Sequence, residues 1–156
     1  MKMLFKQRLF SWFDSYDIYD EQGNVMFVVK GQLSWGHCLK IYDTAGRELG
    51  TVMEKVLTFL PAFDLYEEER YIGRVKKEFT FFMPKFHLEC RDWNITGDIL
   101  EWDYQVKNNM GATVAMVEKK LFNFTDTYEI DVMNSQDVLH VLMIVLAIDA
   151  AKCSNN

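Results

Sequence analysis

The C-terminal part of the chain contains an apolar segment that has no polar side. From Val138 to Ile148 nearly every residue is apolar, so a helix formed here would have no polar stripe to turn toward water. A helix that is apolar all round must be buried on all sides. The apolar stretch, extended to Ala151, is shorter than the ~20 residues that a bilayer-spanning helix needs, and it carries His140 and Asp149. We therefore expect this helix to be buried inside the protein.

A repeated phrase in the rest of the chain can enclose such a helix. Each copy ends in an aromatic or aliphatic anchor that opens an apolar-polar-apolar triplet. The copies are KQRLFSWFDSYDIYD from Lys6, KGQLSWGHCLKIYD from Lys30, EKVLTFLPAFDLYE from Glu54, KKEFTFFMPKFHLE from Lys76 and EKKLFNFTDTYEID from Glu118, with a weaker EWDYQV from Glu101. Their anchors are Tyr16, Leu39, Phe63, Phe86, Tyr104 and Tyr128. This spacing fits one two-stranded unit per repeat.

The repeated triplets predict an all-β fold with one helix. Alternation of apolar and polar residues is typical of half-buried strands, and turn residues follow most of the triplets. Return strands are predicted at 25–30, 49–55, 71–77 and 112–119, with a poorer one near 93–97 and an opening strand at 3–6. Because closure removes exposed sheet edges, we predict an antiparallel closed barrel of about twelve strands. A hydrophobic C-terminal α-helix at about 135–152, capped by Asn134 or Ser135, plugs this single domain of residues 1–156.

The repeats and the tail IDVMNSQDVLHVLMIVLAIDAA resemble the LURP-one-related family, including its short bacterial branch, across essentially the whole chain. The resemblance is carried by the repeated IYD-x-x-G pattern and the LAID segment. It implies the fold shared with phospholipid scramblases and the tubby C-terminal domain, a barrel around a hydrophobic C-terminal helix. Tubby relatives bind phosphoinositides and scramblases act on membrane lipids, but no motif here places phosphoinositide-binding residues or a calcium site on numbered positions.

Charge and cysteine usage exclude several classes of protein. The net charge of −6 argues against a general nucleic-acid binder, which needs a surplus of Lys and Arg. Cys38, Cys90 and Cys153 lie far apart and form no C-x-x-C pair, so neither a disulfide framework nor a zinc ribbon is expected. The first residues lack the uninterrupted apolar stretch of a signal peptide. We expect a cytoplasmic protein without a transmembrane segment.

Two constellations resemble parts of a metal or catalytic site, and both have simpler interpretations. His37-Cys38 and His87-x-x-Cys90 look like halves of a zinc site. Strand alternation instead places His37 inward and Cys38 outward, and His87 outward and Cys90 inward, so no metal is expected. His140 is expected to be a core histidine with one hydrogen-bond partner. No nucleophile elbow or phosphate-binding loop is present, so we predict no catalytic residues, no cofactor and no enzymatic activity.

Lysines and aromatic residues gather at one predicted rim of the barrel. The candidate ligand-binding residues are Lys6, Lys30, Lys55, Lys76, Lys77, Lys119, Lys120, Trp12 and Trp35. The hairpin turns of the opposite rim carry Asp20, Glu21, Asp43, Glu67, Glu68, Glu69 and Asp92. The helix would run from the acidic to the basic rim, where Asp149 needs a rim lysine or arginine as a partner because a buried unpaired carboxylate is costly.

This arrangement supports several hypotheses about function. The leading one is a non-catalytic binding or scaffold domain that recognises an anionic lipid headgroup, a membrane surface or a small ligand at the lysine and aromatic rim. A protein–protein interaction module is the alternative, and an enzyme comes third. In the simplest explanation of the rim itself, the aromatic residues close the barrel mouth as part of the core and the lysines keep the rim soluble.

Overall fold

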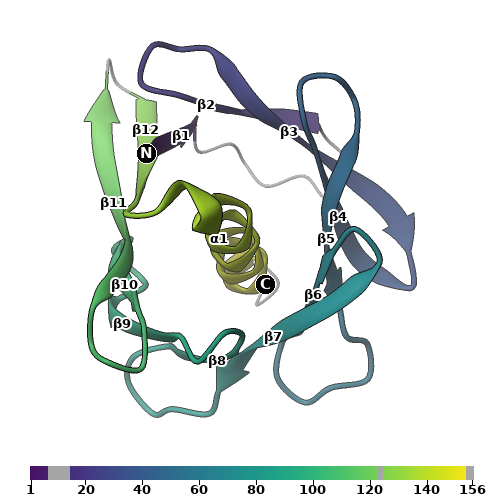
Figure 1. Ribbon diagram of the computed structural model, residues 1–156. Helices are drawn as coiled ribbons and strands as arrows, with labels where there is room; N and C mark the ends of the chain where they lie inside the picture. The colour runs from purple at the N-terminus through teal and green to yellow at the C-terminus, as the bar shows by residue number, and fades with distance from the viewer. Residues whose placement is uncertain (7–14, 123–124, 154–156) are drawn as a thin grey trace.

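Twelve antiparallel strands curl around one helix in the part of the chain that the structure describes, a computed structural model covering residues 1–6, 15–122 and 125–153 (Figure 1). The strands are β1 (Lys2–Lys6), β2 (Ser15–Tyr19), β3 (Val25–Ser34), β4 (Gly36–Tyr42), β5 (Glu48–Glu54), β6 (Ala62–Glu67), β7 (Arg70–Glu78), β8 (Lys85–Glu89), β9 (Asn94–Asp98), β10 (Asp103–Lys107), β11 (Thr113–Phe122) and β12 (Thr125–Val132). A 3₁₀ turn η1 (Ser135–Asp137) leads into helix α1 (Val138–Cys153). The predicted strands and helix are confirmed.

The sheet is a meander that is nearly closed. Its strand order is β8-β7-β6-β5-β4-β3-β2-β1-β12-β11-β10-β9, so the first and last strands of the chain pair with each other. The β1–β2 junction is thin, because Leu4 and Tyr19 are its only paired residues among those described. The ladder stops between β8 and β9, which follow each other in the chain without pairing.

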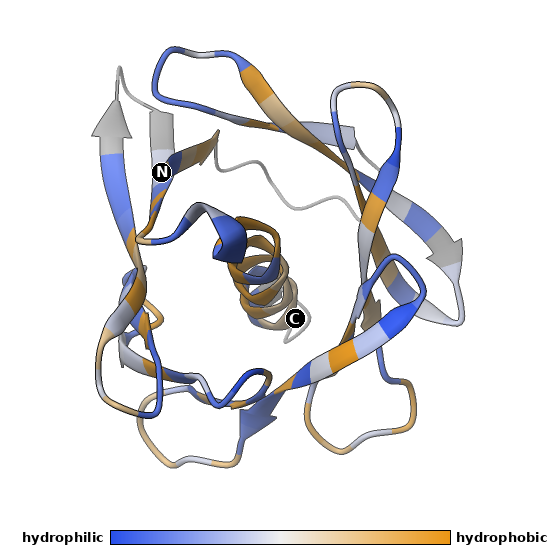
Figure 2. Cartoon of the chain, in the orientation of Figure 1, coloured by the Kyte–Doolittle hydropathy of each residue, from blue (hydrophilic) through white to orange (hydrophobic). Residues whose placement is uncertain are grey.

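The core lies between the inner face of the sheet and the helix. Inward residues of the repeated triplets, such as Ile18, Leu39 and Leu65, are fully buried, as is every residue from Val141 to Ile148. Figure 2 shows this helix as an apolar rod within the ring of strands. Burying one such aliphatic side chain contributes about 1.5–3 kcal/mol. The prediction of an enclosed helix is therefore confirmed, and its enclosure provides the largest share of the core.

Polar contacts fix the first turns of α1 against the barrel. Asn134, one of the two predicted N-cap residues, caps the 3₁₀ turn that leads into α1. Its side chain accepts a hydrogen bond from the Gln136 amide at 3.0 Å. Asp137 pairs with Arg91 in the β8–β9 turn. His140 Nε2 lies 3.1 Å from a carboxylate oxygen of Glu67, which confirms that this histidine has a polar partner in the barrel.

The two ends of the barrel differ, as predicted. The acidic rim, where α1 begins, comprises the turns at 20–24, 43–47, 68–69, 90–93 and 108–112. The aromatic rim, where α1 ends, comprises the β3–β4 turn at Trp35 and the loops at 55–61, 79–84 and 99–102. The segments 7–14 and 123–124 lie outside the described residues.

Candidate functional site

Three neighbouring hairpin connections form the candidate site at the aromatic rim. They are the β3–β4 turn and the loops 55–61 and 79–84, and they adjoin because their strands are consecutive in the sheet. A Cβ atom at Gly36 would lie 2.8 Å from Val56 Cγ1, so the β3–β4 turn packs closely on the next loop. The Lys77 amide donates to the Pro61 carbonyl at 2.9 Å and ties that loop to β7.

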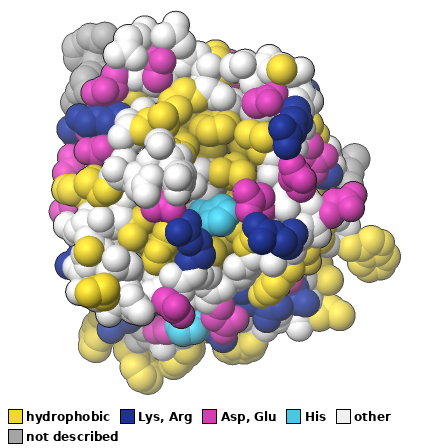
Figure 3. All heavy atoms as spheres, in the orientation of Figure 1, with side chains coloured by type: hydrophobic (Ala, Val, Ile, Leu, Met, Phe, Trp, Pro, Cys, Tyr) yellow, Lys and Arg dark blue, Asp and Glu magenta, His cyan; other side chains and the backbone are white. Residues whose placement is uncertain are grey.

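Large apolar side chains of these connections point into solvent. The residues at least 86% exposed are Trp35, Leu57, Phe59, Phe81 and Phe82. In Figure 3, hydrophobic side chains stand out from the right and lower outline, where Figure 1 draws the connections after β3, β5 and β7. The explanation that the loop aromatics form core is wrong for these residues.

A different aromatic group fills the barrel near the same rim. Trp102 is buried and stacks on Tyr128 with ring centroids 4.0 Å apart, and Phe5 contacts both rings. Lys152 Nζ lies 4.2 Å from the Trp102 ring centroid. Because this cluster and the helix already pack the interior there, the exposed loop aromatics contribute little to the core.

Most of the predicted lysines flank the loops, but several have carboxylate partners that the sequence did not reveal. Lys55 lies 3.9 Å from Asp64. Lys76 lies 3.0 Å from Glu89, and this hydrogen bond lowers the pKa of the Glu89 carboxyl. On the neighbouring wall, Lys120 bridges to Glu129 at 3.2 Å. Pairs at the surface contribute little to stability, so these cations can change partners at low cost.

The remaining predicted residues fall into three groups. Lys30 lies 5.0 Å from the Tyr42 ring centroid, and neither Lys30 nor Lys77 forms an ion pair within the described part of the chain. Lys119 is exposed on β11, on the wall beside Trp102. Two predicted positions lie outside the described side chains: Lys6, of which only the backbone in β1 is described, and Trp12.

One further lysine completes the set. Lys85 begins β8 directly after loop 79–84, is exposed, and has no ion pair among the residues that the structure describes. Its place after the T-F-F-M-P segment mirrors the position of other lysines beside aromatic loops, which is the sequence signal that would have included it. Apolar tips with cations at their base form the surface chemistry of proteins that rest on anionic bilayers.

Asp149 near the C-terminal end of α1 has no ion-pair partner among the side chains that the structure describes. None of the ion pairs among the described residues includes it, because Lys152 Nζ instead donates to the Ile99 and Leu100 carbonyls at 2.8 and 3.3 Å. Part of its surface reaches solvent, but burial raises the pKa of Asp149 to about 6, with Lys152 opposing the shift. The lysine one turn away satisfies the loop carbonyls, and the basic side chains of Lys6 and Arg8 lie outside the described residues, so an ion-pair partner for Asp149 stays a prediction.

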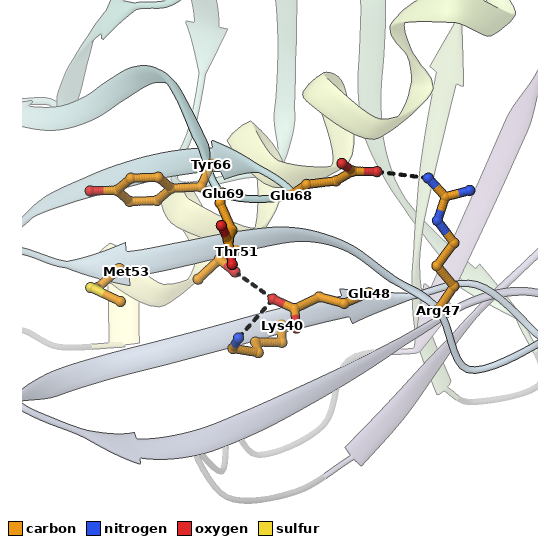
Figure 4. A pocket seen from close by; sticks show the side chains of 8 residues that line it. All are labelled: Lys40, Arg47, Glu48, Thr51, Met53, Tyr66, Glu68 and Glu69. Carbon is orange, nitrogen blue, oxygen red and sulfur yellow. Dashed lines mark hydrogen bonds and ion pairs between the residues drawn. The ribbon is translucent and has the colours of Figure 1, made fainter.

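A groove on the outer wall is lined by charged side chains that are largely paired with one another. It encloses about 590 Å³ over β4, β5 and β6 (Figure 4). Lys40 contacts Glu48 at 2.7 Å, and this hydrogen bond raises the pKa of Lys40. Glu48 also accepts from Thr51, while Arg47 contacts Glu68 across the groove at 2.7 Å. A ligand would have to displace these bonds, so the aromatic rim is the better candidate.

The histidine and cysteine pairs are separate in the fold. His87 is exposed and Cys90 is buried, as predicted. Cys38 alternates with the inward Leu39, which agrees with its expected outward position, although it is buried. His37 contacts Glu54. Burial raises the thiol pKa of both described cysteines. Across the described ranges, no three His, Cys, Asp or Glu residues are grouped as metal ligands would be.

Comparisons with known proteins agree with the fold. The LURP-one-related family model matches residues 1–149. Uncharacterized protein YxjI of Bacillus subtilis (strain 168) is 30% identical over 151 residues, covering 96% of this chain and 92% of that protein. An X-ray structure of an Arabidopsis thaliana protein superposes with a TM-score of 0.62 at 17% identity, covering 95% of this chain and 90% of that one. Within the described residues, no helix has the length and hydropathy of a membrane span.

Proposed function

The chain belongs to the LURP-one-related family, and we propose that it is a non-catalytic domain that docks on anionic lipid bilayers through the aromatic rim. The observation that carries this proposal is the group of exposed apolar side chains at Trp35, Leu57, Phe59, Phe81 and Phe82, with lysines at the base of their loops. Contiguous exposed apolar surface of this kind marks interaction sites rather than ordinary protein surface.

Apolar insertion and charge attraction act at the same face of the molecule. Fully burying one side chain such as Phe59 or Leu57 is worth up to about 1.5–3 kcal/mol, and an interfacial position yields part of that. Each lysine near an anionic bilayer adds about 1 kcal/mol. A few inserted side chains together with Lys77 and Lys85 therefore supply roughly the 8 kcal/mol of micromolar binding. Lys30 lies in the middle of β3 with its ammonium group over Tyr42, too far from the loops to contribute.

Charge asymmetry gives the bound molecule its orientation. The chain carries a net charge of −6, and the turns of the opposite rim contain Asp20, Asp43 and Glu68. An anionic membrane repels that rim and attracts the lysines beside the aromatic loops. Since charges farther from the surface than about 8 Å are largely screened at physiological ionic strength, the acidic rim does not cancel the local attraction.

Vesicle flotation tests the proposal. The full chain is mixed with vesicles of phosphatidylcholine alone or of phosphatidylcholine with phosphatidylglycerol, and the floated fraction is measured. We expect recovery with the anionic vesicles, at least tenfold weaker binding for the double variant Phe59→Asp/Phe81→Asp, and weaker binding at high salt. The matched control is Met110→Asp, since Met110 is 88% exposed at the acidic rim.

Two outcomes would contradict the proposal. Equal recovery with neutral and anionic vesicles would show that the lysines do not contribute to binding. Equal binding of the Phe59→Asp/Phe81→Asp variant and the Met110→Asp control would show that the aromatic rim does not contact the bilayer. In a Trp12→Phe variant, fluorescence of Trp35 adds a local readout, because insertion shifts its emission to shorter wavelength whereas the buried Trp93 and Trp102 stay unchanged.

A further inference from the structure

The gap in the barrel wall lies between two strands that are consecutive in the chain. β8 and β9 end the strand order, and each pairs on one side only, β8 with β7 and β9 with β10. Figure 1 shows the two strands following each other along the lower left of the ring. Beyond their connecting turn, no backbone hydrogen bond joins them in the described part of the chain. Each strand therefore has an unpaired edge facing the other.

The connecting turn itself has the geometry of a tight hairpin. The Trp93 amide donates to the Cys90 carbonyl at 3.0 Å. Arg91 and Asp92 have φ values of 53° and 54°, both in the left-handed region. Two central residues of this kind are typical of the type I′ turn, which ordinarily continues into paired strands. Here the strands separate directly after a turn that favours their pairing.

Contacts to the helix hold this turn in place. The Arg91 guanidinium lies 4.4 Å from the Trp93 ring centroid and also pairs with Asp137 at the start of α1. Trp93 and Leu88 are buried beside the turn, so its position is fixed from the inside. The separation of β8 and β9 is thus a feature of an anchored region rather than of a frayed end.

A groove of about 430 Å³ fills the space between the strands. Its lining includes consecutive residues of both strands, namely Phe86, His87, Leu88, Ile95 and Thr96. The groove extends from Trp93 near the acidic rim to Ile99 near the aromatic rim. The walls are mixed in polarity and short, with β8 and β9 five residues each. Rows of free amide and carbonyl groups on a strand edge are complementary to another extended backbone.

We propose that this groove binds an extended peptide segment of another protein, which adds a strand to the free edges of β8 and β9. Backbone hydrogen bonds supply the affinity, and apolar side chains at alternate positions of the peptide face Trp93 and Ile95. A lipid chain has no donors or acceptors to match the strand edges, so peptide is the favoured occupant. The groove shares Lys85 with the aromatic rim, but none of the five exposed apolar side chains of that rim lines it, so peptide binding does not depend on membrane docking.

The experiment uses a displayed library of random ten-residue peptides selected against the full chain. A selected peptide is then tested against the Thr96→Trp variant, which fills the groove, and against Gln105→Trp as a matched control. Gln105 lies opposite Thr96 on β10 and outside the groove. We expect at least tenfold weaker binding to Thr96→Trp, unchanged binding to Gln105→Trp, and new amide-exchange protection in β8 and β9.

Recognition of the peptide backbone is tested separately by N-methylation of one peptide bond at a time. Strand addition predicts at least tenfold loss at the positions whose N–H groups face an edge. Failure to select any peptide, loss at no methylated position, or equal binding to Thr96→Trp and the unaltered chain would overturn the proposal. A dimer that Thr96→Trp abolishes would also overturn it, since the occupant would then be a second copy of this chain.

Discussion

The acidic and aromatic rims differ in how their connections are held. At the acidic rim, Asp20 accepts backbone hydrogen bonds from Gln22 and Asn24 at 2.9 and 2.8 Å. Asp43 and Asn108 repeat this arrangement in the next two tight turns of the same kind. Each of these side chains closes its own turn, which is the usual stabilising role of Asp and Asn in turns.

At the aromatic rim, the loops contain few internal bonds and expose their largest side chains. Thr58 donates to the Lys55 carbonyl, and Thr80 donates to the Met83 carbonyl, at 3.2 and 2.6 Å. Phe59 and Phe82 nevertheless remain almost fully exposed. The polar side chains of the acidic rim thus stabilise its turns, whereas the exposed aromatic side chains of the other rim have no such structural role, which agrees with the interaction proposed for them. Substitutions at five positions test this contrast through stability.

The largest effect is expected at the helix end beside the aromatic rim, where Asp149→Asn should stabilise the protein by about 2 kcal/mol at pH 7.5. Burial raises the pKa of Asp149 from 3.8 to about 6, so the folded state binds this proton more tightly than the unfolded state does. The resulting stabilisation is complete below about pH 4 and is lost as the pH rises through 6. Urea unfolding of the Asp149→Asn variant and of the unaltered chain between pH 4 and 8 measures the difference in unfolding free energy. A difference in unfolding free energy that stays constant from pH 4 to 8 would contradict the raised pKa of Asp149.

The opposite end of the helix should respond in the opposite direction. Asp137→Asn removes a carboxylate that is buried and paired with Arg91, so the charge-assisted bond is lost. We expect destabilisation by about 1.5 kcal/mol at pH 7.5. Arg91 is partly exposed and can regain water, which limits the loss. Unfolding is measured at the same pH, with Asp103→Asn as the control, because Asp103 is exposed and has no ion pair among the described residues. Equal losses for the two variants would show that the Asp137–Arg91 pair does not stabilise the fold.

Backbone conformation at the acidic rim provides the third test. Gly46 has a φ of +86° and no atom within 4 Å of a built Cβ, so a substitution there meets conformational strain without a clash. Gly46→Ala should cost about 1 kcal/mol in unfolding free energy. Gly46→Asn, which tolerates the left-handed region better, should cost less. Equal losses for Ala and Asn would contradict a conformational cause.

The smallest effect is expected for the exposed aromatic residues. Phe59→Ser and Phe81→Ser should each change the unfolding free energy by less than about 0.5 kcal/mol, since neither side chain is part of the core. Phe63→Ser is the matched contrast, because Phe63 lies four residues from Phe59 and is buried on β6. A loss near 2 kcal/mol at Phe59 would place its side chain in the core and remove the difference between the rims.

Local patterns in the sequence were sufficient for the architecture. Period-two alternation around anchors such as Leu39 and Phe63 specifies which face of each strand is buried, and this information is contained in neighbouring residues. The segment from Val138 to Ile148 specifies its own burial because it has no polar face. The alternation of loops and turns also placed lysines with aromatic residues at one rim, which is the basis of the candidate site.

The ion-pair partners of charged residues that are distant in the sequence could be identified only from the tertiary structure. The sequence contains Lys55, Lys76 and Lys120, but only the register of neighbouring strands brings Asp64, Glu89 and Glu129 beside them. In the same way, Lys152 satisfies the carbonyls of loop 99–102 instead of pairing with Asp149. The gap between β8 and β9 follows from how the whole ring closes around the helix. Composition and periodicity report what each segment buries, whereas the partner of a charge or of a strand edge is set by residues far away in the chain.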